Sequence, residues 1–290
     1  ITMIRTGDVD QSFDPTLITD HAPFLIGKTT LTMDENEVNV GTLLGSDIDG
    51  DSLIYSITAG AEKDLFTIDA STGILIFKTS PDYEDPTDTG GDNLYNVEIS
   101  VSDGTNTTSQ AMTIAINNIN EAPVFTSVTS FTVNENQTSV GTASATDEDG
   151  HTVTYSLTGT DASALSIDSS SGVITFGSAP DYETKTSYSI TVNASDGTNN
   201  TTQSLTVSIT NLNDNSPVMT SAASFTADEN QTAVGTSTYS DADGAISTYT
   251  FSLTGTDASA LSINSSSGVI TFDSAPDYET KTSYTVTVNI

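Results

Sequence analysis

The sequence contains no cysteine and no tryptophan, only two histidines, and only six lysine and arginine residues among 290. Without cysteine, neither a disulfide framework nor a thiolate metal site can form. The 39 acidic residues give a net charge of −33, which repels phosphate backbones and anionic lipid headgroups. We therefore expect no nucleic-acid partner. No apolar run approaches the roughly 20 residues of a membrane-spanning helix, so direct membrane insertion is not expected either.

Short alternating runs of apolar and polar residues predict an all-β protein. In the segment 188–192, Tyr188, Ile190 and Val192 alternate with Ser189 and Thr191, as a half-buried strand requires. Glycine, asparagine and aspartate gather between such runs and mark turns. Apolar residues make up 35% of the chain, which is enough to give each domain a core.

An internal repeat organises the chain. The stretch Gly159–Asn193 recurs as Gly255–Asn289 with substitutions at only four positions, and a more diverged copy precedes both. The period of about 95 residues, with about seven strand-like segments in each copy, is the size of a Greek-key β-sandwich. We therefore predict tandem seven-stranded Greek-key sandwiches.

Short proline-containing linkers set the expected boundaries, because proline cannot donate to a strand ladder. The linkers are 120–123 and 213–217, and they hold few glycines, so flexible tethers are not expected. We expect an N-terminal segment at 1–21, repeat 1 at 22–121, repeat 2 at 122–215 and repeat 3 at 216–290. Repeat 3 is expected to be incomplete and to lack about one strand.

The acidic residues cluster at matching positions in each repeat. Every repeat has a glutamate near its start, an Asp-x-Asp pair about twelve residues later, and an Asp-Tyr-Glu triplet past its middle. Such oxygen-only sets suit a hard cation. Calcium takes six to eight oxygen ligands, whereas zinc prefers histidine and cysteine, so the sequence predicts calcium sites.

The order and spacing of these motifs, together with the Asn-x-Asn-Asp-Asn linker, resemble the cadherin repeat. The resemblance runs from about residue 22 onward and implies that calcium binds at the junctions between repeats. At the first junction it implies the ligands Glu35, Asp82, Glu84, Asn120, Glu121, Asp147, Asp149 and Asp196. At the second junction it implies Glu135, Asp181, Glu183, Asn213, Asp214, Asp241 and Asp243.

The linkers depart from the family pattern at three positions. Asn118 and Asn211 stand where the family usually has aspartate, which removes one charge from each junction. Glu121 replaces the usual aspartate and lengthens the reach of the carboxylate. We expect the charges lost at Asn118 and Asn211 to lower calcium affinity.

The resemblance implies a calcium-rigidified, secreted stalk or adhesion protein of the cell surface whose partners are copies of itself or other surface proteins. An enzyme is not expected, because His21 and His151 lack a recurring nucleophile partner and the paired acids recur in every repeat. One alternative is an extracellular filament or matrix subunit in which the strand-like start of the chain, 1–4, completes repeat 3 of a neighbour. Another is a polysaccharide-binding module, which the lack of tryptophan disfavours.

Overall fold

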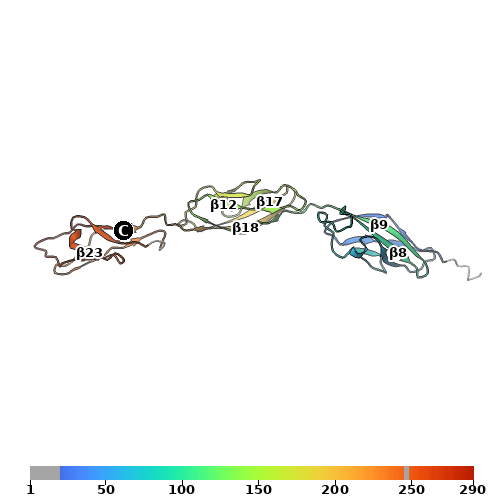
Figure 1. Cartoon of the computed structure of the whole chain (residues 1–290), viewed down its shortest axis with the longest axis horizontal. Coiled ribbons are helices and arrows are strands. Elements are labelled where there is room, and N and C mark those ends of the chain that lie inside the picture. Colours follow the sequence, from blue (N-terminus) through green and yellow to red (C-terminus); the bar gives the residue numbers. More distant parts are fainter. Residues whose placement is uncertain (1–19, 245–247) are drawn as a thin grey trace, which may run out of the picture. The chain divides into compact units, whose positions relative to one another are not determined.

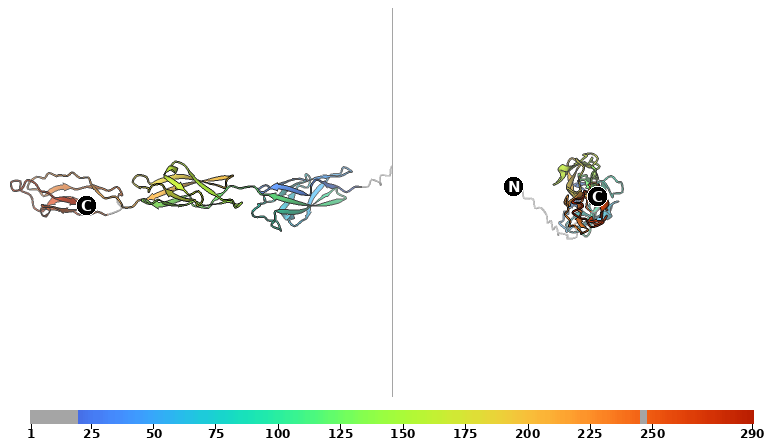
Figure 2. Two further views of the ribbon diagram at one scale, coloured as in Figure 1. Left: turned by 90° about the horizontal axis from the view of Figure 1, so that it is seen from above. Right: turned by 90° about the vertical axis from the view of Figure 1, so that its left-hand side faces the viewer.

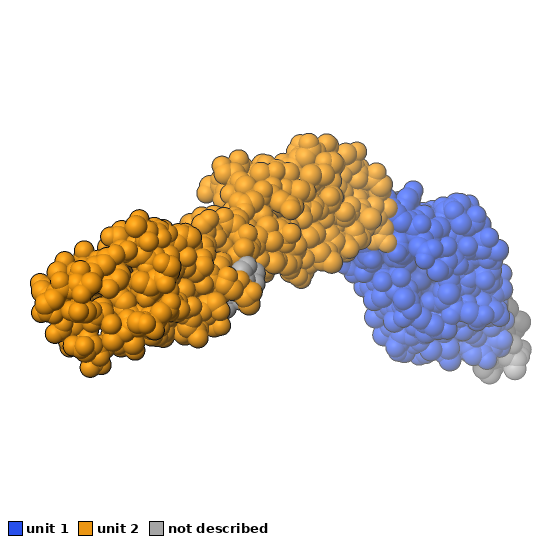
Figure 3. All heavy atoms as spheres, turned by 60° about the vertical axis from the view of Figure 1, so that its left-hand side comes forward, with its two compact units in different colours: residues 1–121 blue, residues 122–290 orange. Residues whose placement is uncertain are grey.

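A computed structural model describes residues 20–244 and 248–290 of the chain. Two compact units are distinguished, residues 1–121 and residues 122–290 (Figure 3). The N-terminal segment that we predicted to complete a neighbouring repeat, 1–19, lies outside the described residues. Among those described, no helix has the length and apolar character needed to cross a bilayer.

The first unit is a sandwich of two main sheets. Its strands are β1 (Phe24–Ile26), β2 (Thr30–Asp34), β3 (Asn39–Thr42), β4 (Leu44–Ser46), β5 (Ile54–Ala59), β6 (Phe66–Ile68), β7 (Ile74–Phe77), β8 (Leu94–Ser102) and β9 (Thr107–Asn117). One sheet has the order β2-β9-β8-β5 and the other β3-β7-β6, while β1 and β4 form a separate pair. The 3₁₀ helix η2 (Lys63–Leu65) precedes β6.

Alternating side chains of the two sheets fill the core of this unit. In β9, Met112, Ile114 and Ile116 are buried, and in β8 the fully buried Tyr95 packs edge-on against Phe77. β8 and β9 run antiparallel side by side (Figures 1 and 2). β2 pairs with β9 in parallel. The last strand, β9, therefore lies between two partners and is central to its sheet.

Repeat 2 has the same architecture. Its strands are β10 (Val124–Phe125), β11 (Ser130–Asn134), β12 (Ser139–Thr142), β13 (Ala145–Thr146), β14 (Thr154–Thr158), β15 (Leu165–Ile167), β16 (Val173–Phe176), β17 (Ser187–Ser195) and β18 (Asn200–Thr210), with the 3₁₀ helix η3 (Ala162–Ala164). The main sheets have the orders β11-β18-β17-β14 and β12-β16-β15. Here β18 occupies the central position that β9 holds in repeat 1.

Repeat 3 keeps only part of this arrangement. Its strands are β19 (Val218–Met219), β20 (Ala233–Thr236), β21 (Tyr239–Ser240), β22 (Ser252–Thr254), β23 (Leu261–Ile263), β24 (Val269–Phe272) and β25 (Thr287–Asn289), with the 3₁₀ helix η4 (Ala258–Ala260). The three-stranded sheet β20-β24-β23 is intact, but the four-stranded sheet is reduced to the pair β22-β25. The prediction of all-β sandwich repeats with an incomplete third repeat is confirmed.

Candidate metal centre

A buried glutamate follows the second strand of each complete repeat. Glu135 comes directly after β11, and its side chain is only 1% exposed. Its carboxylate accepts hydrogen bonds from the backbone N–H groups of Tyr182, at 2.8 Å, and Leu212, at 2.7 Å. Asn136 then turns the chain with a φ of 63°. This one carboxylate thus connects the strand end, the Asp-Tyr-Glu loop and the linker.

Repeat 1 builds the same arrangement around Glu35. Its carboxylate accepts the backbone N–H of Tyr83 at 2.6 Å and of Ile119 at 2.8 Å. In repeat 3 the equivalent Glu229 is exposed and accepts the N–H of Tyr278 at the longer distance of 3.2 Å. The glutamates of repeats 1 and 2 are therefore each held by two backbone hydrogen bonds, one of them from the linker.

Two acid clusters meet at the end of repeat 2. Oxygens of Glu135, Asp181 and Glu183 lie within 4.8 Å of one another, and so do oxygens of Glu183, Asp214 and Asp243. Glu183 belongs to both clusters. The structure therefore brings together five of the seven residues predicted for the second junction, and they come from repeat 2, the linker and repeat 3.

The linker residue Asn215 lies at the centre of the second cluster. Its amide nitrogen Nδ2 donates to Oδ1 of Asp243 at 2.8 Å, to Oδ1 of Asp214 at 2.9 Å and to Oε2 of Glu183 at 3.3 Å. Asp243 is buried and also accepts the backbone N–H groups of Asp214 and Asn215. Three carboxylates therefore converge on one partially positive group, which marks a position suited to a cation.

The pKa values reflect this crowding of negative charge. Partial desolvation, together with the charges of Glu135, Asp243 and Asp181, holds the pKa of Glu183 above its ordinary value. Burial also raises the pKa of Asp243, but the hydrogen bonds from Asn215 and Asp214 outweigh it and leave that pKa below its ordinary value. Desolvation first, and then the neighbouring negative charges, thus disfavour the ionised form of Glu183.

The two remaining residues predicted for the second junction, Asn213 and Asp241, contact the same tyrosine. The Tyr249 hydroxyl lies 2.6 Å from Oδ2 of Asp241 and 3.4 Å from Oδ1 of Asn213. Asp241 in turn accepts the backbone N–H of Asp243 at 2.9 Å, which fixes the Asp-x-Asp turn. In the same linker, Oδ1 of Asn211 is buried and has no hydrogen-bond partner among the described residues. A carbonyl oxygen of this kind is a suitable calcium ligand.

Residues predicted for the first junction fall in both units, so the two sets are described separately. In the first unit, oxygens of Glu35, Asp82 and Glu84 lie within 4.8 Å of one another. Asn118 donates to Glu84, and Asn36 donates to Oε1 of Glu121 at 2.8 Å. Asn120 turns its amide toward the backbone carbonyl of Glu121, at 3.3 Å.

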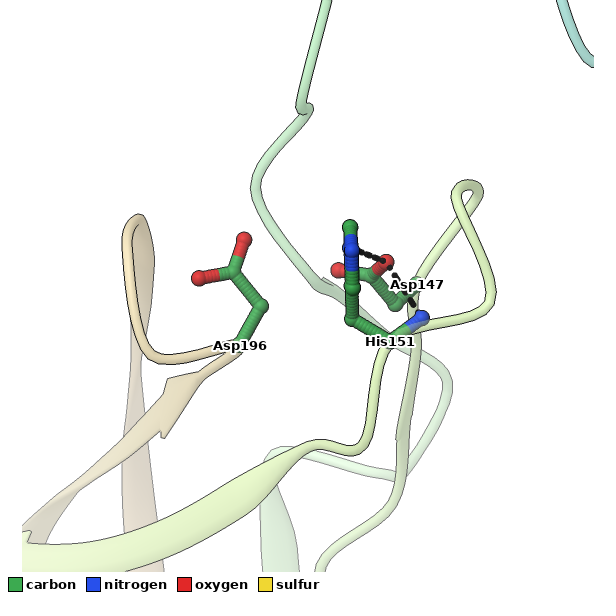
Figure 4. A group of neighbouring side chains, drawn as sticks. All are labelled: Asp147, His151 and Asp196. Atoms are coloured by element: carbon green, nitrogen blue, oxygen red, sulfur yellow. Dashed lines mark hydrogen bonds and ion pairs between the residues drawn. The ribbon is translucent and has the colours of Figure 1, made fainter.

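In the second unit, Asp147 and Asp196 approach each other together with His151, as Figure 4 shows. Nδ1 of His151 lies 3.3 Å from Oδ1 of Asp147, which also accepts the His151 backbone N–H at 3.0 Å. The Asp147 side chain is 1% exposed, and its Oδ2 has no hydrogen-bond partner among the described residues. The Asp149 side chain is 3% exposed. Buried carboxylate oxygens of this kind fit a hard divalent cation.

Sequence reasoning missed several polar residues at these sites. The side chains of Asn36, Asn136, Asn215 and His151 all contact predicted acids. Asn36 and Asn136 could have been found, because an asparagine directly follows the glutamate in each repeat. A further group of acids lies at the start of repeat 1 and includes its Asp-x-Asp pair. Desolvation, and then the charges of Asp47, Asp20, Asp103 and Asp49, raise the pKa of Asp51.

Two family models match the chain. Residues 129–210 match the Cadherin domain, and residues 20–116 match the Bacterial Ig domain. Protocadherin Fat 4 of Mus musculus is 34% identical over 161 residues, which cover 51% of this chain and 3% of that protein. Cadherin-23 of Homo sapiens is 31% identical over 193 residues, which cover 62% of this chain and 6% of that protein. The chain therefore spans a small fraction of these relatives.

Solved cadherin structures share the fold. Mouse cadherin-23 EC22-24 superposes with a TM-score of 0.57 at 21% identity and covers 90% of both chains. The extracellular cadherin domains 3-6 of protocadherin gamma B2 superpose with a TM-score of 0.58 at 21% identity, over 89% of this chain and 66% of that one. At this level of identity the likeness concerns the β-sandwich repeats alone.

Proposed function

This chain belongs to the cadherin-repeat family, and on that premise we propose that it is a calcium-dependent, extracellular stalk or adhesion segment. Calcium ions at the ends of the repeats would hold neighbouring sandwiches in a fixed orientation. At the second junction the residues that would hold calcium are Glu135, Asp181, Glu183, Asn213, Asp214, Asp241 and Asp243. At the first they are Glu35, Asp82, Glu84, Asn120, Glu121, Asp147, Asp149 and Asp196.

The observation that carries this proposal is the convergence of Glu183, Asp214 and Asp243 on the amide of Asn215. Two like charges about 4 Å apart repel by roughly 4 kcal/mol at an effective dielectric constant near 20. A single amide group neutralises little of that repulsion. A divalent ion supplies two positive charges to the same oxygens and would lock the linker between the repeats.

The calcium affinity expected for these sites indicates whether they would be filled inside or outside the cell. Extracellular calcium modules commonly bind in the range of about 0.1–1 mM, far above cytosolic calcium concentrations. We expect these sites to fall in that range, because asparagine replaces aspartate at residues 118 and 211. They would then be filled outside the cell and empty in cytosol.

A structural joint also accounts for the recurrence of the acid sets better than catalysis does. The same Glu and Asp-Tyr-Glu positions recur in all three repeats, whereas an enzyme requires one reaction centre. We therefore propose a non-enzymatic role. The polysaccharide-binding alternative has no tryptophan platform to support it.

Small-angle scattering and thermal unfolding of the chain, in 2 mM calcium and then in excess chelator, would test the proposal. We expect a stiffer particle and a higher Tm with calcium. Asp243→Asn should weaken the response, whereas Asp273→Asn, which removes an exposed acid of the same repeat, should not. Equal dimensions and equal Tm in both buffers would show that the acid clusters are only solvated surface.

A further inference from the structure

A histidine lies within a cluster of aspartates at the start of repeat 2. Nδ1 of His151 lies 3.3 Å from Oδ1 of Asp147 and 3.9 Å from Oδ2 of Asp149. A ring nitrogen of His151 and carboxylate oxygens of Asp147 and Asp196 all lie within 4.8 Å of one another (Figure 4). All of these residues belong to the second unit. The cluster therefore offers one imidazole and two carboxylates to a common point.

The pairing of two strands brings these side chains together. Thr154, the first residue of β14, pairs with Ser195, the last residue of β17. Asp196 directly follows this pair and His151 precedes it by three residues, so both lie at the same end of the sheet. Oδ1 of Asp196 accepts the backbone N–H of Asn199 at 2.6 Å, which fixes this carboxylate in its turn. The backbone thus positions the carboxylate without help from the histidine ring.

Hydrogen bonding within the cluster leaves a buried oxygen without a partner. The Asp147 side chain is only 1% exposed, and its Oδ2 has no hydrogen-bond partner among the described residues. Its Oδ1 already accepts the backbone N–H of His151 at 3.0 Å. The 3.3 Å from this oxygen to Nδ1 exceeds the roughly 2.7–3.2 Å of an ordinary N–H···O bond. A buried carboxylate oxygen without a partner is costly, so it indicates a bound cation.

The histidine indicates which kind of cation. Calcium and magnesium take oxygen ligands, whereas imidazole nitrogen suits zinc, copper and nickel. Zinc binds nitrogen and oxygen at about 2.0–2.2 Å in a tetrahedron, which places neighbouring ligand atoms roughly 3.3 Å apart. Nδ1 of His151 and Oδ1 of Asp147 have this separation. The histidine is also particular to repeat 2, because the same position is Asp51 in repeat 1 and Ala245 in repeat 3.

We propose that Asp147, His151 and Asp196 form a binding site for a transition-metal ion of the zinc class. The two carboxylates and the imidazole hold the ion, and water takes the fourth position. Both carboxylates also belong to the calcium set proposed for the first junction, so zinc and calcium compete for them. Zinc binding itself needs no calcium, and its failure would leave the proposed junction function untouched.

Nuclear magnetic resonance of the histidine rings tests the site directly. The chain has only two histidines, so the ring nitrogens of each are assigned with His21→Ala and His151→Ala. Zinc chloride is titrated into the isotope-labelled 290-residue chain, first without calcium and then in 2 mM calcium. We expect one equivalent of zinc to shift the Nδ1 signal of His151, and calcium to raise the zinc concentration that this shift requires.

Calorimetric titration with zinc measures the contribution of each ligand. His151→Ala and Asp196→Asn should each weaken the tightest zinc-binding step by at least about tenfold, because loss even of an outer-shell partner commonly costs about 10–100-fold. Glu148→Gln removes an exposed acid of the same turn and should leave zinc affinity unchanged. Equal zinc affinity in His151→Ala and the parent chain, or a His151 ring signal that zinc does not move, would overturn the proposal. The Tm shift in calcium, measured without zinc, tests the junction function separately.

Discussion

The buried carboxylate of Glu135 accepts a hydrogen bond from the backbone N–H of Leu212 at 2.7 Å. This contact connects the end of β11 to the linker that leaves β18, 77 residues further along the chain. The same carboxylate belongs to an acid cluster with Asp181 and Glu183. Glu135 therefore fixes the linker backbone and contributes charge to the candidate metal centre.

Replacing Glu135 with glutamine should destabilise repeat 2 even in chelator. A glutamine has one acceptor oxygen, so one of the two N–H groups that now meet the carboxylate would lose its partner. Loss of a hydrogen bond to a charged group costs about 1.5–3 kcal/mol. Denaturant unfolding in excess chelator, with hydrogen exchange to resolve the repeats, measures the loss.

Glu229→Gln is the matched control for that variant. Glu229 is the equivalent residue of repeat 3, but it is exposed and its hydrogen bond to Tyr278 is 3.2 Å long. We expect a change of less than about 0.5 kcal/mol, as is usual for a surface substitution. Equal losses in the two variants would contradict the role assigned to burial of Glu135.

Asp243→Asn should lower calcium affinity at the second junction by about tenfold or more. The substitution removes a charge that is buried beside Asp214 and Asn215, and calcium affinity falls with the number of charged ligands. Calorimetric titration of the chain with calcium gives the affinity, and Asp273→Asn serves as the exposed control. An unchanged isotherm would remove Asp243 from the set of ligands.

The sequence was sufficient to predict which acids are equivalent between repeats, but not how they are held. Asp-x-Asp and Asp-Tyr-Glu recur in register, so their clustering followed from the repeat itself. The backbone contacts of Glu135 depend on the path of the linker, which periodicity does not specify. The contact between Asn136 and Asp214 joins residues 78 positions apart, and nothing local in the sequence encodes it.

The fold was predictable for a related reason. The alternation of apolar and polar residues in segments such as 188–192 is a local pattern with a period of two. It predicts directly which side chains face the core. The missing strand of repeat 3 was also expected, because repeat 2 supplies the template. That residues 224–228 would lose strand structure was not expected, since their own sequence still resembles β11. Strand formation there depends on a partner and not on local propensity.

Matched glycine substitutions should show how firmly the phenylalanine ring beside each glycine is held in repeat 2 and in repeat 3. A Cβ added at Gly141 would lie 2.4 Å from a ring carbon of Phe131, and one at Gly235 would lie 2.4 Å from a ring carbon of Phe225. Phe131 packs against the complete core, whereas Phe225 is 38% exposed and has room to move. We expect Gly141→Ala to cost about 1–3 kcal/mol through overpacking and Gly235→Ala to cost less.

Hydrogen exchange resolved by repeat, or limited proteolysis of the two variants, would measure this difference. If both variants lose the same stability, the ring of Phe225 is held as firmly as that of Phe131.

The turn between β6 and β7 should contribute to acid sensitivity. Asp69 accepts hydrogen bonds from the Ser71 hydroxyl and from the backbone N–H groups of Ser71 and Thr72. These bonds, that of the Ser71 hydroxyl first, lower the pKa of Asp69 from 3.8 to about 2. Because the folded pKa lies below the unfolded one, the stabilisation is complete above about pH 4 and is lost as the pH falls toward 2.

Asp69→Asn should therefore be less stable than the parent chain at pH 7, and the difference should shrink as the pH falls from 4 to 2. Repeat 3 offers the reciprocal test, since Asn264 holds the equivalent position and accepts the N–H groups of Ser266 and Ser267. Asn264→Asp should gain stability at neutral pH and lose that gain in acid. Urea unfolding at a series of pH values compares each variant with the parent, and a difference that does not vary with pH would show that the turn does not depend on the charge.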